Sequence, residues 1–109
     1  MDASVLLTIA ALMEVIMICF FSLLDPSMCW LVNTGHFLLT RLLLEKLKSS
    51  PSGGRVVNVM ANAYRLGEIV LDDLQFEQRE YKPGEAYAQS KLAVLLSTRK
   101  LARHLDRMR

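Results

Sequence analysis

The chain has 109 residues, of which 52% are hydrophobic, and a formal net charge of +2. This length allows one small domain with a modest core. Because the basic residues are interleaved with acidic ones, the sequence offers no basic patch for a polyanion, and we expect no nucleic acid partner. The two cysteines, Cys19 and Cys29, lack His neighbours and metal-ligand spacing. They predict free thiols in a reducing compartment and no metal site.

The charged residues divide the chain into an apolar head and a mixed-charge body. The first 40 residues hold three charged side chains, Asp2, Glu14 and Asp25, whereas all 13 basic residues lie from Arg41 onward. Within the head, residues 5–24 form an apolar run interrupted only by the charge of Glu14. A run of about 20 such residues is long enough to cross a bilayer as a helix. An ionised carboxylate at mid-membrane would oppose this by roughly 2.5–3.5 kcal/mol.

We therefore leave three interpretations of the head open. Residues 1–25 form an apolar helix that is a membrane anchor, a helix buried in a protein core, or a head unrelated to the rest of the chain. Residues 26–109 form the C-terminal part of a larger domain. If the head inserts, the excess of basic residues after it places the domain on the cytoplasmic side of the membrane.

The domain begins with a helix signal. Asp25 is a favoured N-cap residue and Pro26 suits the first helical position, which predicts a helix from Pro26 to about Lys48. The Ser-Ser-Pro-Ser-Gly-Gly segment at residues 49–54 then ends it. Residues 55–60, Arg-Val-Val-Asn-Val-Met, are the best strand candidate. Their nearly continuous apolar character is typical of a strand covered on both faces.

The rest of the chain is expected to be a long loop and a second helix. In residues 61–83 we expect a turn at Gly67, a short helical turn at 72–74, and acidic side chains that are solvated. From residue 85 to about 107, leucines recur on one side and basic residues mainly on the other, as in an amphipathic helix. One strand cannot form a sheet. The chain is thus part of a larger α/β domain, or its partner strands come from elsewhere.

The front of this second helix carries the most informative pair of residues. Tyr87 and Lys91 lie four positions apart, so they share one helix face. An ammonium beside a phenol favours the phenolate and lowers a pKa that otherwise lies near 10. The spacing therefore predicts a tyrosine that serves as a proton donor or acceptor near neutral pH.

Several segments in this order resemble the short-chain dehydrogenase/reductase family, within it the retinol-dehydrogenase-like branch. They are residues 32–40 (Val-Asn-Thr-Gly-His-Phe-Leu-Leu-Thr), 55–59, 71–74, 86–93 (Ala-Tyr-Ala-Gln-Ser-Lys-Leu-Ala) and 98–102. The resemblance implies a partial Rossmann-like, doubly wound α/β fold. It also implies hydride transfer between NADP or NAD and a retinoid- or steroid-like alcohol or carbonyl. For the location of the protein, we expect the endoplasmic reticulum membrane, facing the cytoplasm, or the cytoplasm.

The resemblance also assigns roles to single residues. Tyr87 takes the place of the general acid/base, and Lys91 that of the lysine that binds the nicotinamide ribose. Asn33 takes the place of the helix asparagine that supports a proton-relay water. Only Thr34 separates Asn33 from Gly35, where the family usually has two residues, and a one-residue deletion rotates a helix by about 100°. Ala61 stands where the family has its catalytic serine and brings no hydroxyl.

The nucleotide cradle of the family has no counterpart in this sequence. A glycine-rich turn that seats the pyrophosphate on a helix N-terminus is absent, and the five glycines are scattered between Gly35 and Gly84. We expect the chain alone to be inactive or nearly so. The alternative is a catalytically dead interaction fragment that forms a homo- or hetero-dimer through its helices, for example with a full-length relative. A third interpretation is a shortened product without function.

Overall fold

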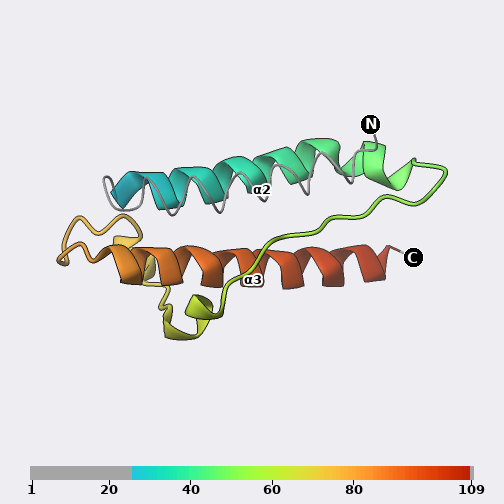
Figure 1. The fold of residues 1–109 in the computed structure, drawn as a ribbon. Helices are drawn as coiled ribbons and strands as arrows, with labels where there is room; N and C mark the ends of the chain where they lie inside the picture. The colour runs from blue at the N-terminus through green and yellow to red at the C-terminus, as the bar shows by residue number, and fades with distance from the viewer. Residues whose placement is uncertain (1–25, 109) are drawn as a thin grey trace.

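The computed structural model describes the backbone of residues 26–108 and the side chains of residues 33–108. Two long helices dominate this part, α2 (Pro26–Lys48) and α3 (Pro83–Arg107). They contact each other and run in the same general direction (Figure 1). Both helices predicted from the sequence are thus confirmed. The expectations for the head, residues 1–25, lie outside the described residues.

Local sequence explains where these helices begin and end. Pro26 and Pro83 each stand at the first helical position, where a missing N–H group costs no hydrogen bond. Basic residues occupy the last turn of both helices, where they complement the negative end of the helix dipole. After α2 the chain turns sharply: the Gly53 N–H donates to the Ser50 carbonyl at 3.0 Å, and Gly53 has a φ of 77°. A side chain there would be strained.

The strand predicted for residues 55–60 is wrong for this structure, because the described residues contain no strand. The segment runs as extended chain from the end of α2 across α3 (Figure 1). No backbone–backbone hydrogen bond joins it to another described residue. An extended segment becomes a strand only when a neighbour completes its hydrogen-bond ladder, and the described part of the chain offers none. Of the elements expected for an α/β fold, the described residues therefore confirm the helices and not the strand.

Two short 3₁₀ helices, η1 (Asn62–Leu66) and η2 (Leu71–Asp73), shape the loop before α3. The first packs against α3. It ends at Gly67, whose N–H donates to the Tyr64 carbonyl at 3.0 Å. A Cβ at Gly67 would overlap the carbonyl of Ala88 and lie 3.1 Å from the Cβ of Leu92. The glycine therefore lets the loop approach the backbone of α3 closely.

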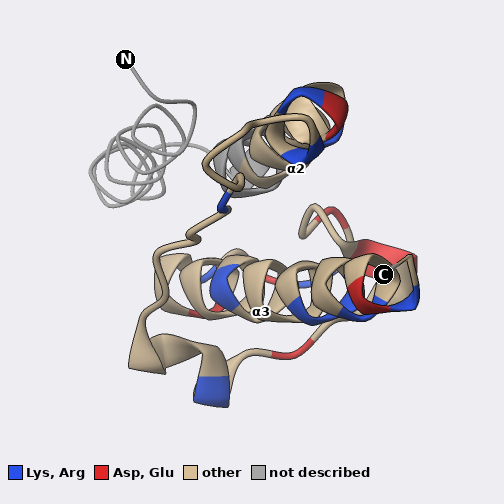
Figure 2. Cartoon of the chain, turned by 90° about the vertical axis from the view of Figure 1, so that its right-hand side faces the viewer, with Lys and Arg blue, Asp and Glu red and all other residues tan. Residues whose placement is uncertain are grey.

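The interior between these elements is small and partly polar. Among the described side chains, the buried apolar ones are Leu47, Phe76, Ala86 and Ala88. Thr40, Asp73, Gln89, Ser90 and Lys91 are buried as well. Charged residues are spread along α3, the end of α2 and the segments between the two helices (Figure 2). No helix in residues 26–108 is both long and apolar enough to cross a membrane.

Candidate functional site

The front of α3 holds Tyr87 and Lys91 on one face, as their spacing predicts. Lys91 is fully buried, with 0% of its surface exposed. Its Nζ lies 5.7 Å from the centre of the Tyr87 ring and has no hydrogen-bond partner within the described part of the chain. Amino groups are almost never buried without partners, because their desolvation is costly. An orphaned donor of this kind suits a ligand that brings an acceptor.

Asn33 of α2 reaches the same turn of α3. Its Nδ2 donates to the backbone carbonyl of Ser90 at 3.2 Å, and Ser90 directly precedes Lys91. The short spacing between Asn33 and Gly35 therefore leaves the Asn33 side chain directed at α3. Its Oδ1 is buried and, within residues 33–108, has no hydrogen-bond partner. Among the described residues, a donor on α3 and an acceptor on α2 thus both lack hydrogen-bond partners.

Ala61 lies at the end of the extended segment and is half-buried. Its carbonyl accepts the N–H of Tyr64 at 3.2 Å and so begins η1. A methyl side chain there gives the site no hydroxyl. Of its polar neighbours, Asn62 is exposed, and the ring of Tyr64 lies 5.9 Å from the guanidinium of Arg65.

The loop before α3 contains an ordered cluster that the sequence analysis missed. Asp73 is only 8% exposed, so its interpretation as a solvated loop residue is wrong. Its Oδ1 accepts the backbone N–H groups of Glu77 and Gln78 at 2.7 and 3.2 Å, and its Oδ2 accepts that of Arg79 at 3.0 Å. The guanidinium of Arg79 completes an ion pair with Asp73 at 3.6 Å. In the sequence, this cluster is marked only by an Asp, a glycine-free stretch at residues 74–78 and the Arg that follows it.

This cluster is joined to α3 through Gln89, which lies between Tyr87 and Lys91. The Oε1 of Gln89 accepts a hydrogen bond from Arg79 Nη2 at 2.8 Å, and its Nε2 donates to the Leu74 carbonyl at 2.9 Å. The guanidinium of Arg79 also stacks 3.9 Å from the ring centre of Phe76. The loop therefore fixes the first turns of the helix that carries the Tyr–Lys pair.

The charge of Asp73 is stabilised by its surroundings. Burial of the carboxyl by itself raises its pKa. The backbone N–H groups of Glu77, Gln78 and Arg79, together with the Arg79 guanidinium, outweigh this and hold the pKa of Asp73 below its ordinary value. No group of three or more potential metal ligands occurs among the described residues.

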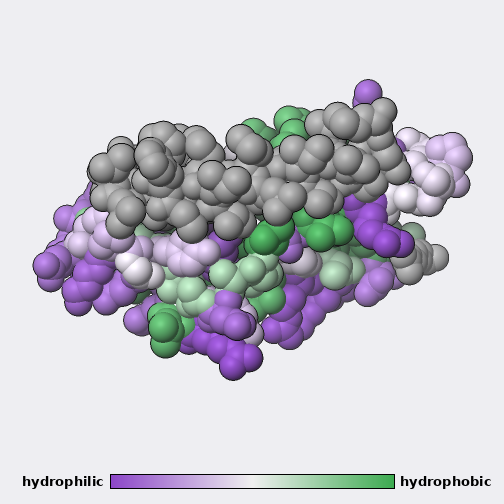
Figure 3. Space-filling view, in the orientation of Figure 1, coloured by the Kyte–Doolittle hydropathy of each residue, from purple (hydrophilic) through white to green (hydrophobic). Residues whose placement is uncertain are grey.

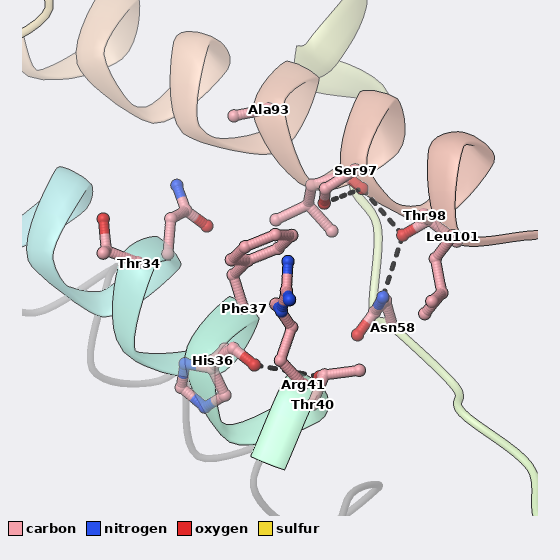
Figure 4. Close-up of a pocket in the computed structure, with 12 residues that line it drawn as sticks. Thr34, His36, Phe37, Thr40, Arg41, Asn58, Ala93, Ser97, Thr98 and Leu101 are labelled. Atoms are coloured by element: carbon pink, nitrogen blue, oxygen red, sulfur yellow. Dashed lines mark hydrogen bonds between the residues drawn. The ribbon is translucent and has the colours of Figure 1, made fainter. Parts of the chain in front are cut away.

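A pocket of about 360 Å³ opens between α2, α3 and the extended segment (Figure 4). Phe37 and Arg41 reach into it from α2, and Thr98 and Leu101 line it from α3. The Asn58 Nδ2 donates to Thr98 Oγ1 at 2.8 Å and so attaches the extended segment to α3. Asn33 also lines the pocket, whereas Tyr87 and Lys91 do not. The pocket therefore lies further along α3 than the Tyr–Lys pair.

Comparison with known proteins shows which proteins this chain resembles. Human retinol dehydrogenase 12 is 56% identical to the chain over 74 residues, which make up 68% of this chain and 23% of the relative. Human retinol dehydrogenase 11 is 57% identical over 74 residues, 67% of this chain and 22% of the relative. Human retinol dehydrogenase 13 is 49% identical over 74 residues, 68% of this chain and 22% of the relative.

This chain carries part of a retinol-dehydrogenase-like short-chain dehydrogenase/reductase domain. It spans about a fifth of the length of the curated relatives that it matches. No family model and no solved structure matches the chain.

Proposed function

We propose that this retinol-dehydrogenase-like chain carries the proton-transfer part of an NAD(P)-dependent oxidoreductase site. Its substrate would be an alcohol or carbonyl of a retinoid- or steroid-like molecule. The observation that carries the proposal is the buried, unpartnered amino group of Lys91, 5.7 Å from the ring centre of Tyr87. The names of the human relatives, retinol dehydrogenases 11 to 13, support the same chemistry.

In this proposal each residue of the chain has a separate task. The Tyr87 hydroxyl gives its proton to a carbonyl oxygen, or takes one from an alcohol. The Lys91 amino group donates to a ribose hydroxyl and favours the phenolate of Tyr87. Asn33 holds the turn between them through its hydrogen bond to the Ser90 carbonyl. A bound nicotinamide would supply or accept the hydride.

In this proposal the chain would hold a dinucleotide at its ribose end only. At the ribose end, the Lys91 amino group is a buried donor without a partner among the described residues. At the phosphate end, the adjacent glycines Gly53 and Gly54 follow the C-terminus of α2 and lead into the extended segment, not into a helix N-terminus. Because Ala61 also brings no hydroxyl, we propose that the 109-residue chain is inactive by itself.

Reconstitution with the missing half of the site tests this function. The chain is mixed with, or fused to, the part of human retinol dehydrogenase 12 that lies outside the matched 74 residues, and reduction of retinal by NADPH is followed. We expect no turnover by the chain alone and measurable turnover by the pair. Ala61→Ser should raise the rate by about 10²-fold, the lower range for one transition-state hydrogen-bond donor.

Two substitutions decide whether the assigned residues carry the reaction. Tyr87→Phe removes the proton and should lower kcat by at least about 10²-fold. Lys91→Met should raise KM for the nucleotide as well as lower kcat. Lys100→Met, an exposed change on the same helix, is the matched control. Turnover that survives Tyr87→Phe contradicts the site, and turnover by the isolated chain contradicts its inactivity.

A second candidate function is that of an interaction fragment that pairs through its helices with a full-length relative. The observation in its favour is the apolar outer face of α2, where Leu38 and Leu42 are 55% and 70% exposed at i, i+4 spacing. Co-purification with full-length human retinol dehydrogenase 12 tests this candidate. Loss of the complex in Leu42→Lys supports it, whereas absence of any complex with the unaltered chain contradicts it.

We further propose that residues 5–24 anchor the chain in the endoplasmic reticulum membrane with the domain facing the cytoplasm. A cytoplasmic protein is the alternative. The support is the apolar run itself and the position of all basic residues after it. Retention of the chain in microsomes after carbonate washing, with the domain accessible to added protease, would agree with the anchor. Release into the wash would contradict it.

A further inference from the structure

Within the described part of the chain, the extended segment of residues 55–60 has an unused hydrogen-bonding edge. Its backbone N–H and C=O groups make no backbone–backbone hydrogen bond to any other described residue. The next such bond along the chain is the one from Tyr64 to Ala61. A row of unpaired backbone groups on an extended chain is a template for another strand.

The two faces of the segment differ. Val56 lines a pocket of about 560 Å³ at the C-terminal ends of the two helices, and Asn58 lines the pocket of about 360 Å³ beside it. These alternate side chains therefore face the helices. Since successive side chains of an extended chain point to opposite sides, Arg55, Val57 and Val59 lie on the outer face. Val57 is 44% exposed.

The surface agrees with this assignment. In the space-filling view, hydrophobic residues gather beside the hydrophilic surface of α3, along the course that the extended segment takes in Figure 1 (Figure 3). Three of the six residues in the segment are valine, which favours pairing in a sheet. The segment thus combines outward-facing valines with backbone groups that are open among the described residues. It contains no proline, and its one charged residue, Arg55, stands at its start.

We propose that residues 55–60 pair with the same segment of a second copy of this chain, antiparallel about a two-fold axis. Charge selects the direction of the pairing. Arg55 is the only charged residue of the segment. Parallel pairing in register would place Arg55 opposite Arg55, which is repulsive. Antiparallel pairing centred on Asn58 places Arg55 opposite Ala61 instead.

The same register is self-complementary on the outer face. It sets Val57 of one copy opposite Val59 of the other, and the two-fold axis repeats this contact. The helices of both copies then lie on one side of the new two-stranded sheet. This support matters, because a two-stranded ribbon alone is marginally stable in water. The pairing involves neither Tyr87 nor Lys91, but it places Arg55 of one copy beside Ala61 of the other, so it is proposed for the chain alone and not for the reconstituted site.

The test measures the oligomeric state of the full chain, in a mild detergent with micelles in excess over protein. Sedimentation is followed over a concentration series together with hydrogen exchange. We expect a monomer–dimer equilibrium in which the amides of residues 55–60 become protected as the dimer forms. We place Val57 and Val59 as a hydrogen-bonded pair of the ladder. Val57→Pro then removes a donor to the partner strand that makes no backbone hydrogen bond among the described residues of the monomer, and it should weaken dimerisation about tenfold or more.

Two further variants complete the design. Val57→Thr keeps a β-branched side chain and should retain the dimer. Leu42→Lys alters the exposed face of α2 and should also leave the dimer intact. Helical circular dichroism confirms that each variant is folded. A monomer at all concentrations, an open-ended fibril, or a dimer that is lost in Leu42→Lys but kept in Val57→Pro would each overturn the proposal.

Discussion

The Lys91 amino group is buried and has no hydrogen-bond partner among the described residues, so its position opposes folding. Removing an amino group from water without a hydrogen-bond partner costs several kcal/mol by transfer estimates. Its contact with the Tyr87 ring returns about 0.5–2 kcal/mol. The cost is therefore larger than the gain. Groups that lower stability are typical of functional sites, which supports a ligand-binding role for this position.

We predict that Lys91→Met stabilises the folded chain by about 1 kcal/mol or more, since methionine has a similar length and no polar group to desolvate. Urea unfolding followed by circular dichroism measures the free energy of unfolding. Lys100→Met changes an exposed lysine on the same helix and should stay within about 0.5 kcal/mol of the unaltered chain. A destabilised Lys91→Met variant would show that the amino group contributes net stability.

The lowered pKa of Asp73 predicts how its loop responds to acid. A carboxylate whose pKa is depressed by folding stabilises the loop above its unfolded pKa of about 3.9, and this contribution disappears as the pH falls through the lower folded pKa. We expect the amides of Glu77, Gln78 and Arg79 to stay protected from hydrogen exchange at pH 5 and to lose protection in the acid range below about pH 4.

Asp73→Asn should weaken this protection at pH 5 and above, where Asp73 is ionised, and remove most of its pH dependence. Asp72→Asn is the matched control, because Asp72 is the exposed neighbour. Its variant should behave like the unaltered chain. If the Asp73→Asn amides remain protected, the carboxylate does not hold the loop.

At the scale of the elements, sequence patterns predicted the helices well and the contacts between them poorly. Apolar periodicity and the two prolines were sufficient for α2 and α3, because those signals are local. The strand at residues 55–60 failed, since a strand depends on a neighbour that the described residues do not provide. The position of Tyr87 and Lys91 on one helix face was predictable from their spacing of four residues. The burial of Lys91 and the cluster around Asp73 depend on packing between distant segments, which a single sequence does not reveal.

Gly67 shows how closely the loop and α3 approach. Gly67→Ala should lower the free energy of unfolding by about 1–3 kcal/mol, because the new methyl group overlaps the Ala88 carbonyl and the loop must move away. The φ of −78° at this position is open to alanine, so backbone strain is not the cause. Gly84→Ala is the control, since no atom lies within 4 Å of its added Cβ. Equal stabilities of the two variants in urea would contradict this packing.

For the whole molecule, the small interior sets the stability. Among the described side chains only four apolar ones are buried, and two of these are alanines. We therefore expect a free energy of unfolding below about 5 kcal/mol, the lower limit for typical domains. Thermal and urea unfolding at a concentration where the chain is monomeric measure this value. A higher free energy would mean that the residues outside the described part add substantially to the core.

Because Lys91 is buried, the rate at which its amino group reacts with a reagent reports how often this part of the structure opens. Lys46, Lys48, Lys82 and Lys100 are exposed, so an amine-directed acylating reagent should label them at once. Lys91 becomes reachable only when the first turns of α3 separate from α2 and the loop. The delay between the rapid labelling of those four residues and the slow labelling of Lys91, read by mass spectrometry, would give the rate at which this end of the helix pair opens.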